Sequence, residues 1–128
     1  MKDLVLVDSS AWIAAARADG DREIAVKIGT LLESGLAAMT EPVWMELYQG
    51  IRGKREDARL EMTRGLCVWL EFNTDCWREA ARIARVCRCS GVNVPFGDVL
   101  VDACARYHQV ALLERDRHFA MIAKALET

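Results

Sequence analysis

The stretch Leu4-Val5-Leu6-Val7-Asp8-Ser9-Ser10 decides the fold that we expect for this chain. A continuous apolar run that includes β-branched residues is typical of a short strand buried on both faces. The carboxylate of Asp8 follows at once, and Ser9 or Ser10 can cap a helix that we expect to run through Ala18. A strand, an acid and a helix in immediate succession indicate the first unit of a parallel α/β sheet.

The remainder of the chain continues this alternation. Further strands are predicted at 36–39, 68–73 and 110–113. Helices are predicted over 23–34, from Thr40 to Gly50, from the charged turn at 53–56 to 66, over 74–90, over 98–108 and over 118–126. The pattern predicts an α/β fold, with a short central parallel sheet of about four or five strands flanked by helices. The length of 128 residues predicts a single domain over 1–128.

The bulk composition is that of an ordinary globular protein, with 52% hydrophobic and 28% charged residues. No apolar run is long enough to span a bilayer, and the start lacks a signal-peptide pattern, so we expect a cytoplasmic protein without a membrane partner. The formal net charge of −2 does not indicate a nucleic-acid binder. An RNA partner must therefore be argued from local features.

The five cysteines are an odd number and lie in segments predicted to be helical, which indicates free thiols that pack as small apolar residues. Cys87 and Cys89 are close in sequence, but residues two apart on a helix point in different directions. No second Cys or His pair in the sequence completes a set of zinc ligands. A zinc site is therefore not predicted.

Acidic residues fall where predicted strands end or where helices next to them begin. Asp8 follows the first strand and Asp116 follows the last, and the carboxyl ends of parallel strands meet at one edge of a sheet. Glu46 lies on the helix after the second strand, among mostly apolar neighbours that we expect to be buried. Asp98 begins the helix before the last strand, and Asp102 is one turn further along.

Carboxylates gathered at one edge repel one another and favour a bound cation. Oxygen ligands of this kind suit Mg²⁺ or Mn²⁺, which can activate water and stabilise the charge that develops when a phosphate is attacked. The pattern therefore predicts hydrolysis of phosphodiester bonds. Each acid also has a simpler interpretation, as a helix cap for Asp8, a solvent-facing residue for Glu46, a first-turn acid for Asp98 and a turn residue for Asp116. For Asp102, direct coordination and a solvent-facing or supporting role are equally consistent with the sequence.

Four segments resemble, in order, the motifs of PIN domains. Asp8-Ser9-Ser10-Ala11-Trp12-Ile13 resembles the opening motif, and Pro42-Val43-Trp44-Met45-Glu46-Leu47 with Gly50 resembles the second acidic motif. Gly97-Asp98-Val99-Leu100, with Ala103 and Ala105, resembles the third. The fourth motif corresponds to Leu112-Leu113-Glu114-Arg115-Asp116-Arg117-His118-Phe119, which resembles it. The resemblance therefore covers nearly the whole chain.

The most similar subgroup is that of the VapC toxins. This resemblance implies a Mg²⁺- or Mn²⁺-dependent endoribonuclease that is usually a homodimer and is held inactive by a VapB-type antitoxin. It implies catalytic roles for Asp8, Glu46, Asp98 and Asp116. Ser10 matches a small hydroxyl position beside the site. Two departures from the family pattern, Glu114 in place of Thr or Ser and Asp102 in place of a small apolar residue, add negative charge near the site.

The predicted metal ligands are Asp8, Asp98 and Asp116, with Glu46 and Asp102 as further candidates. Arg115 and Arg117 flank the last acid, so they are the basic residues that we expect to contact RNA. Other Arg and Lys side chains alternate with Asp and Glu, which favours a self-paired, solvated surface. His108 is interpreted as a helix-end residue and His118 as a capping or packing residue. A final group, Trp12, Trp44, Leu47 and Tyr48, either packs in the core or lines a groove for an antitoxin or a second copy.

The alternative to a nuclease is a catalytically silent PIN-like protein that binds RNA or a partner, although the intact acids argue against it. Receiver domains and haloacid-dehalogenase-like phosphatases also place acids at the edge of a sheet. A receiver domain needs an acidic pair early in the chain and a lysine near the last strand, whereas Arg115 stands before Asp116 here. The phosphatases need a second aspartate two residues after the first, where this chain has Ser10.

Overall fold

A parallel sheet forms the centre of the computed structural model, which describes residues 3–127. Its four strands lie in the order β3-β2-β1-β4, and every neighbouring pair is parallel. The predicted α/β fold is therefore confirmed, with four strands in the sheet. In chain order the elements are β1 (Val5–Val7), α1 (Ser9–Ala16), α2 (Arg22–Glu33), β2 (Ala37–Met39), α3 (Glu41–Gln49), α4 (Lys54–Leu66), β3 (Val68–Trp69), α5 (Thr74–Cys89), α6 (Phe96–His108), β4 (Ala111–Leu113) and α7 (His118–Leu126).

The register of the strands brings segments from both ends of the chain together. β1 pairs with β2 through Val5 and Ala37, and with β4 on its other side. The backbone N–H of Asp8 donates to the carbonyl of Leu113 at 2.9 Å, so this pairing continues to the point where both strands end. The first acid of the sequence thus lies beside the segment that carries the last one.

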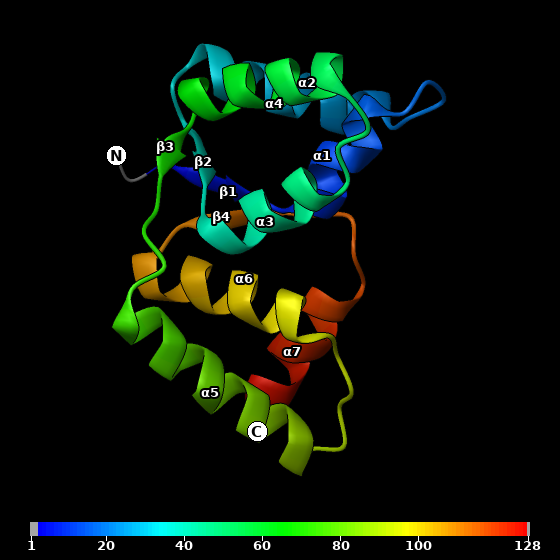
Figure 1. Ribbon diagram of the computed structural model, residues 1–128. Coiled ribbons are helices and arrows are strands. Elements are labelled where there is room, and N and C mark those ends of the chain that lie inside the picture. Colours follow the sequence, from blue (N-terminus) through cyan, green and yellow to red (C-terminus); the bar gives the residue numbers. More distant parts are fainter. Residues whose placement is uncertain (1–2, 128) are drawn as a thin grey trace.

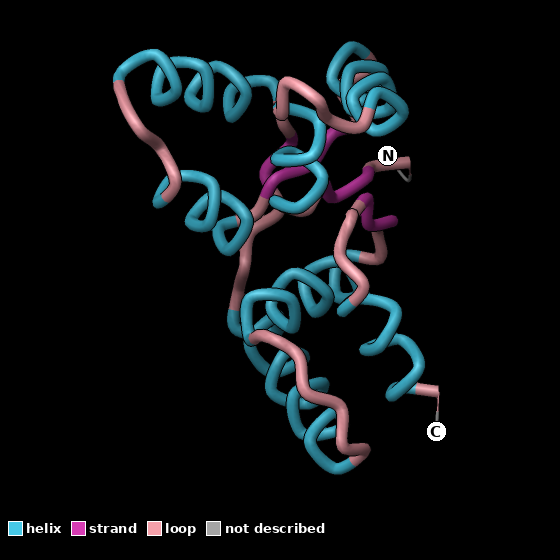
Figure 2. The backbone as a smooth tube through the Cα atoms, turned by 90° about the vertical axis from the view of Figure 1, so that its right-hand side faces the viewer, coloured by secondary structure: helices cyan, strands magenta, loops and turns pink. Residues whose placement is uncertain are grey.

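Helices cover both faces of the sheet. α5, α6 and α7 gather on one side of it, and α2 and α4 lie on the other (Figure 1). The view turned by 90° shows the short strands enclosed between the two groups of helices (Figure 2). Leu6, Met39 and Val101 belong to one buried cluster that joins the sheet to α6. Ile83, Val99 and Ile122 belong to a second, which holds α5, α6 and α7 together.

The element boundaries differ from the prediction at two points that matter for the site. β3 covers only Val68–Trp69, shorter than the predicted 68–73. α6 begins at Phe96 after Pro95, two residues earlier than predicted, because the fixed φ of proline suits the position before a helix. Asp98 therefore lies inside the first turn of α6 rather than at its first residue. Within residues 3–127, no helix is both long and apolar enough to cross a membrane.

Candidate active site

Asp8 is the N-cap of α1, the role that its simpler interpretation predicted. Its Oδ2 accepts hydrogen bonds from the backbone N–H of Ser10 at 3.0 Å and from the Ser10 hydroxyl at 2.6 Å. The side chain is 1% exposed, yet Oδ1 has no hydrogen-bond partner in the described part of the chain. Because an unpaired buried carboxylate oxygen is costly, capping alone does not account for this residue.

Asp98, Asp116 and His118 form a second part of the site. One ligand atom from each lies within 4.8 Å of the others. Nδ1 of His118 is 2.7 Å from Oδ1 of Asp116 and 3.0 Å from Oδ2 of Asp98. His118 was predicted from the sequence to be a capping or packing residue, so its place in this cluster was not foreseen. Its position directly after the Asp116-Arg117 pair, at the first residue of α7, was the signal in the sequence.

The two aspartates of this cluster influence one another's ionisation. Burial raises the pKa of Asp98 to about 7, and its hydrogen-bonding with Asp116 and the charges of Asp116 and Asp8 act in the same direction. Burial also works to raise the pKa of Asp116, but that pKa is lowered because the backbone N–H of His118 donates to its Oδ1 at 2.9 Å. The carboxylates of Asp8, Asp98 and Asp116 are thus close enough to repel one another.

Glu46 approaches this group from α3. The hydroxyl of Ser9 donates to its Oε1 at 2.8 Å. Its Oε2 faces Gly97: a Cβ atom built on this glycine would lie 3.8 Å from Oε2 of Glu46. The carboxylate therefore lies between the residue that follows Asp8 and the residue that precedes Asp98.

The environment predicted for Glu46 is confirmed for Val43, which is fully buried, but was wrong for Met45 and Tyr48. We expected its apolar neighbours to be buried, but Met45 is 69% exposed and Tyr48 is 52% exposed. Val43 is the fully buried residue of α3. α3 thus presents a largely exposed surface, and the bond from Ser9, rather than burial, holds the carboxylate of Glu46 in place.

The residues present fit a divalent cation. Asp8 Oδ1 is buried and has no hydrogen-bond partner among residues 3–127, and the buried Asp98 Oδ2 makes no hydrogen bond there but faces Nδ1 of His118 at 3.0 Å. A cation accepts electron pairs from such oxygens and offsets their mutual repulsion. The donors at this edge are carboxylate oxygens with one imidazole, and the oxygens suit Mg²⁺ and Mn²⁺.

Glu114 and Asp102, the two departures from the family pattern, have different surroundings. Oε1 of Glu114 accepts a hydrogen bond from the backbone N–H of Asp116 at 2.7 Å, so Glu114 supports the turn that presents Asp116. Asp102 is buried and forms a hydrogen-bonded ion pair with Arg106 one turn later on α6. Burial raises the pKa of Asp102, and the Arg106 guanidinium opposes this. Asp102 is not part of the Asp98–Asp116–His118 cluster.

The two arginines predicted to contact RNA also differ. Nε of Arg115 donates to Oδ2 of Asp21 at 2.8 Å, and its guanidinium lies 3.7 Å from Glu23. The Arg115 backbone N–H donates to the Ser10 hydroxyl at 2.9 Å, which links this loop to the Asp8 cap. Arg117 is exposed beside the site. Of the two, Arg117 is the side chain that can reach a phosphate without breaking a described ion pair.

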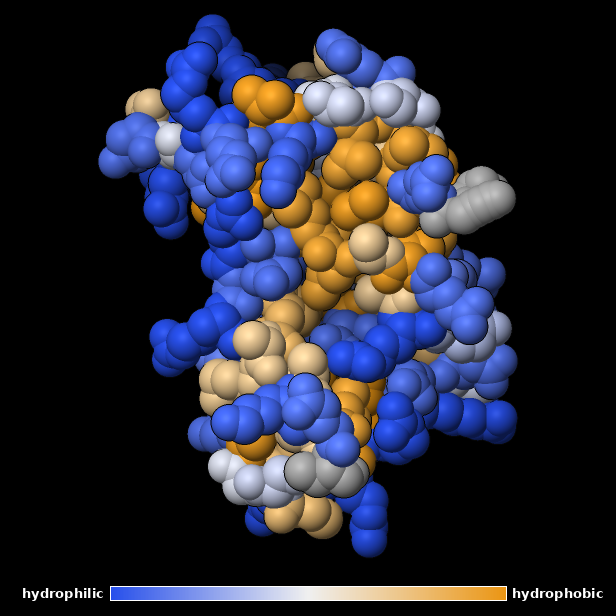
Figure 3. Space-filling model, turned by 180° about the vertical axis from the view of Figure 1, so that it is seen from behind, coloured by the Kyte–Doolittle hydropathy of each residue, from blue (hydrophilic) through white to orange (hydrophobic). Residues whose placement is uncertain are grey.

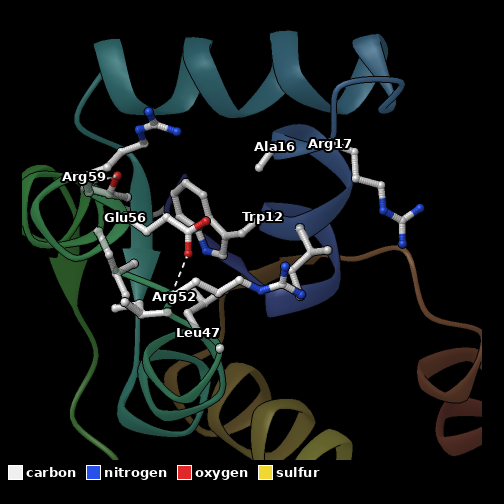
Figure 4. A pocket seen from close by; sticks show the side chains of 12 residues that line it. Trp12, Ala16, Arg17, Leu47, Arg52, Glu56 and Arg59 are labelled. Carbon is white, nitrogen blue, oxygen red and sulfur yellow. Dashed lines mark hydrogen bonds between the residues drawn. The ribbon is translucent and has the colours of Figure 1, made fainter. Parts of the chain in front are cut away.

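A groove of ≈ 660 Å³ lies between α1, α3 and α4. Trp12 and Ala16 of α1 face it from one side, Leu47 of α3 from below, and Arg59 of α4 from the other side (Figure 4). The Trp12 indole N–H donates to the carbonyl of Val7 at 3.1 Å, so its ring is fixed in place. Trp44 instead stacks on Tyr48 and contacts Trp69. The four apolar residues predicted to act together therefore lie in two places. Trp12 and Leu47 line the groove, whereas Trp44 and Tyr48 stack on each other outside it.

Comparison with known proteins agrees with this architecture. The family model of the PIN domain matches residues 5–125. The chain belongs to the PIN-domain family. Among curated proteins, this PIN domain is 34% identical over 125 residues to "VapC ribonuclease Mb1587" of Mycobacterium bovis, an alignment that covers 94% of the chain and 92% of the relative. The same identity and coverage hold for "Ribonuclease VapC11" of Mycobacterium tuberculosis.

Solved structures share the fold at lower sequence identity. The DNA-bound VapBC of Salmonella typhimurium superposes on this PIN domain with a TM-score of 0.77 at 13% identity, over 93% of this chain and 91% of the other. For Mycobacterium tuberculosis VapC20, described as a Sarcin-Ricin loop cleaving toxin, the TM-score is 0.65 at 19% identity, over 91% and 93% of the two chains. The predicted likeness to PIN domains of the VapC type is thereby confirmed.

Proposed function

We propose that this PIN domain is a metal-dependent endoribonuclease and the toxin component of a type II toxin–antitoxin module. The observation that carries the proposal is the buried Oδ1 of Asp8, which has no hydrogen-bond partner in the described residues, together with the cluster of Asp98, Asp116 and His118. The 34% identity to proteins named VapC ribonucleases supports the same reaction class. The exposed position of Glu46 beside these acids adds a further carboxylate to the site.

Each residue has a defined task in this proposal. Asp8, Asp98 and Asp116 hold Mg²⁺ or Mn²⁺, and Glu46 completes the set of carboxylates at the edge of the site. When bound, the cation supplies activation of a water molecule and stabilisation of the charge that develops on the phosphate. Ser10 orients Asp8 through two hydrogen bonds. His118 orients Asp116 through its backbone N–H.

RNA contact is proposed to involve Arg117 and Phe96. Arg117 is exposed and directly follows Asp116, so its guanidinium suits a backbone phosphate near the site. Phe96, at the first residue of α6 and 77% exposed, offers a ring on which an unpaired base can stack. The Arg115 guanidinium can bind RNA only if its ion pairs with Asp21 and Glu23 break, so we expect a smaller contribution from Arg115 than from Arg117.

A cleavage assay on total RNA tests the proposal. Wild-type protein is incubated with Mg²⁺, Mn²⁺ or EDTA and compared with Asp8→Asn and Asp98→Asn. Asp19→Asn serves as the matched control, because Asp19 is an exposed residue in the turn before α2. Discrete products that require metal, and that disappear in the two site variants but not in the control, are expected. RNA binding without cleavage by well-folded wild-type protein would instead support the catalytically silent alternative.

The groove between α1, α3 and α4 is the proposed docking site for a VapB-type antitoxin. Its floor is apolar around Trp12 and Leu47, and Arg17, Arg52 and Arg59 lie along its rim with Glu56. This combination fits an amphipathic segment with apolar anchors and acidic flanks. Ile13 also lines the groove and is 49% exposed. We expect co-purification with a VapB-type antitoxin to be abolished by Ile13→Asp and not by Asp19→Asn. If the Ile13→Asp variant still bound the antitoxin, the docking site would have to lie on another surface.

A homodimer is proposed from the opposite face of the molecule. Seen from behind, a broad hydrophobic area lies over the upper half of the protein (Figure 3). An apolar groove lined by Val5, Val26, Leu31 and Leu113 lies between α2 and the edge strand β4. Exposed apolar surface beside an edge strand favours association. The expected mass in light scattering is that of two chains, and Val26→Glu is expected to reduce it to one.

A further inference from the structure

α5 and α6 bring together three metal-ligating side chains that the acidic site does not use. Ligand atoms of Cys76, Cys104 and His108 lie within 4.8 Å of one another. A zinc site was not predicted from the sequence, because no two pairs of Cys or His that are close in sequence complete a ligand set. The structure instead joins Cys104 and His108, which share one face of α6 at a spacing of four residues, to Cys76 across the interface with α5.

We propose that Cys76, Cys104 and His108 form a binding site for Zn²⁺, with the fourth position taken by water or an added ligand. Two sulfurs and one imidazole nitrogen are a donor set that zinc prefers in proteins. Three protein ligands with one open position are typical of zinc sites that are not purely structural. About ten residues of helix, or about 15 Å at the usual rise of an α-helix, separate His108 from Asp98, so the site is distinct from the acids.

The surroundings of the three side chains favour a cation. Burial raises the pKa of both thiols, so an ion that binds here displaces their protons. The carboxylate of Glu41 interacts electrostatically with both thiols. It is held as an anion by the indole N–H of Trp69 at 2.7 Å and the backbone N–H of Phe72 at 2.9 Å. A thiophilic cation therefore meets a negative potential at this site.

The ring of His108 is already held in position. Its Nε2 lies 2.9 Å from the carbonyl oxygen of Glu71, and the same oxygen is 3.7 Å from the sulfur of Cys76. A metal-binding histidine is usually oriented by a hydrogen bond from one ring nitrogen to a backbone carbonyl, so the contact of Nε2 with Glu71 leaves Nδ1 of His108 to bind the ion. Cys76 and Cys104 are fully buried, whereas His108 is only half-buried, so an ion enters from the histidine side.

Cobalt binding tests the site through a signal that RNA cleavage does not influence. The reduced, metal-stripped chain is titrated with Co²⁺ in excess Mg²⁺, which occupies the carboxylates, and the thiolate-to-cobalt absorption band is recorded. We expect one equivalent of Co²⁺ to give this band and Zn²⁺ to abolish it by displacement. His108→Gln and Cys104→Ser are expected to weaken binding by more than about tenfold, since changes that only disturb a ligand's support already cost 10–100-fold.

Matched controls come from the same residue types elsewhere in the chain. His118→Gln and Cys89→Ser remove a histidine and an exposed cysteine outside the cluster, and both are expected to keep the band. His108→Gln replaces a half-buried residue, so it provides the test even if Cys104→Ser does not fold. Absence of the band in the wild type, its persistence in His108→Gln, or its loss in His118→Gln or Cys89→Ser would each overturn the proposal.

Discussion

The two ends of α6 each contribute to a three-residue cluster of donor atoms, but the clusters differ in charge. At the first turn, Asp98 meets Asp116 and His118, and the carboxylates repel one another. At the last turn, Cys104 and His108 meet Cys76, and burial raises the pKa of Cys104 to about 12, so the metal-free thiol is neutral. The repulsion at the acidic end favours a bound cation, whereas the neutral thiol end has no such repulsion.

This difference shows why unpartnered atoms, rather than proximity alone, identify the primary site. Asp8 Oδ1 is buried without a hydrogen-bond partner in the described residues, whereas the sulfur of Cys76 contacts the carbonyl oxygen of Glu71 at 3.7 Å. We therefore expect changes at the acidic end to abolish function. Changes at the thiol end are expected to alter metal content instead.

The largest expected effect follows from Asp116→Asn. Asparagine has the same size as aspartate but lacks its charge, and its side-chain oxygen can still accept the hydrogen bond from the backbone N–H of His118, so we expect folding to be retained. We expect RNA cleavage to fall by at least about 100-fold, the upper end of what is lost when only the support of a metal ligand is removed. Initial rates at saturating Mg²⁺ measure the effect, and a loss below about threefold would exclude Asp116 from the site.

Asp102→Ala is expected to reduce stability rather than activity. Asp102 is one turn from Asp98, but its carboxylate pairs with Arg106 instead of the acidic cluster. Loss of a largely buried hydrogen bond to a charged group costs about 1–3 kcal/mol in free energy of unfolding. Denaturant unfolding measures this change. If stability were unchanged while Mn²⁺ affinity fell, Asp102 would be a ligand, as one interpretation of the sequence allowed.

A smaller effect is expected from Ser9→Ala, which removes the hydroxyl that donates to Glu46 at 2.8 Å. The carboxylate of Glu46 is then free to rotate away from the other acids. We expect a loss of activity of about tenfold, which is typical when the support of a ligand is lost. Ser90→Ala, at the exposed end of α5, is the matched control. Equal rates for the two variants would show that Glu46 does not need this bond.

The smallest effect is expected from Glu114→Thr. A threonine hydroxyl at this position can accept the backbone N–H of Asp116 that Glu114 now binds. The change also removes one negative charge from the surface that RNA approaches. We expect KM for RNA to fall by about threefold with little change in kcat, as for a single solvent-screened charge. A large fall in kcat would instead make Glu114 part of the metal site.

Much of the fold could be predicted because its signals are local. The apolar run before Asp8 and the short apolar segment before Glu114 each predict a buried strand, and the order of strands and helices follows from them. Parallel strands then place Asp8 near the segment that carries Asp116. The family motifs, which cover the chain from its first strand to its last helix, agree with the match to the PIN-domain model over residues 5–125.

The remaining features depend on side-chain directions that a single sequence does not reveal. His118 joins the acids because the turn from β4 to α7 points its ring at Asp98 and Asp116. Arg115 has a suitable position for RNA, but Asp21, distant in sequence, binds its guanidinium. Cys76 meets Cys104 only when α5 packs on α6. In each case the decisive contact joins residues from separate elements, which no local pattern records.

Mn²⁺ binding measured by electron paramagnetic resonance of the free ion tests the central claim most directly. Wild type, Asp98→Asn and the exposed control Asp19→Asn are titrated under the same conditions, and RNA is omitted so that cleavage plays no part. We predict that wild type and Asp19→Asn bind Mn²⁺ equally and that Asp98→Asn binds more than about tenfold more weakly. Equal affinity in Asp98→Asn, or no binding by the wild type, would contradict a cation site built on Asp8, Asp98 and Asp116.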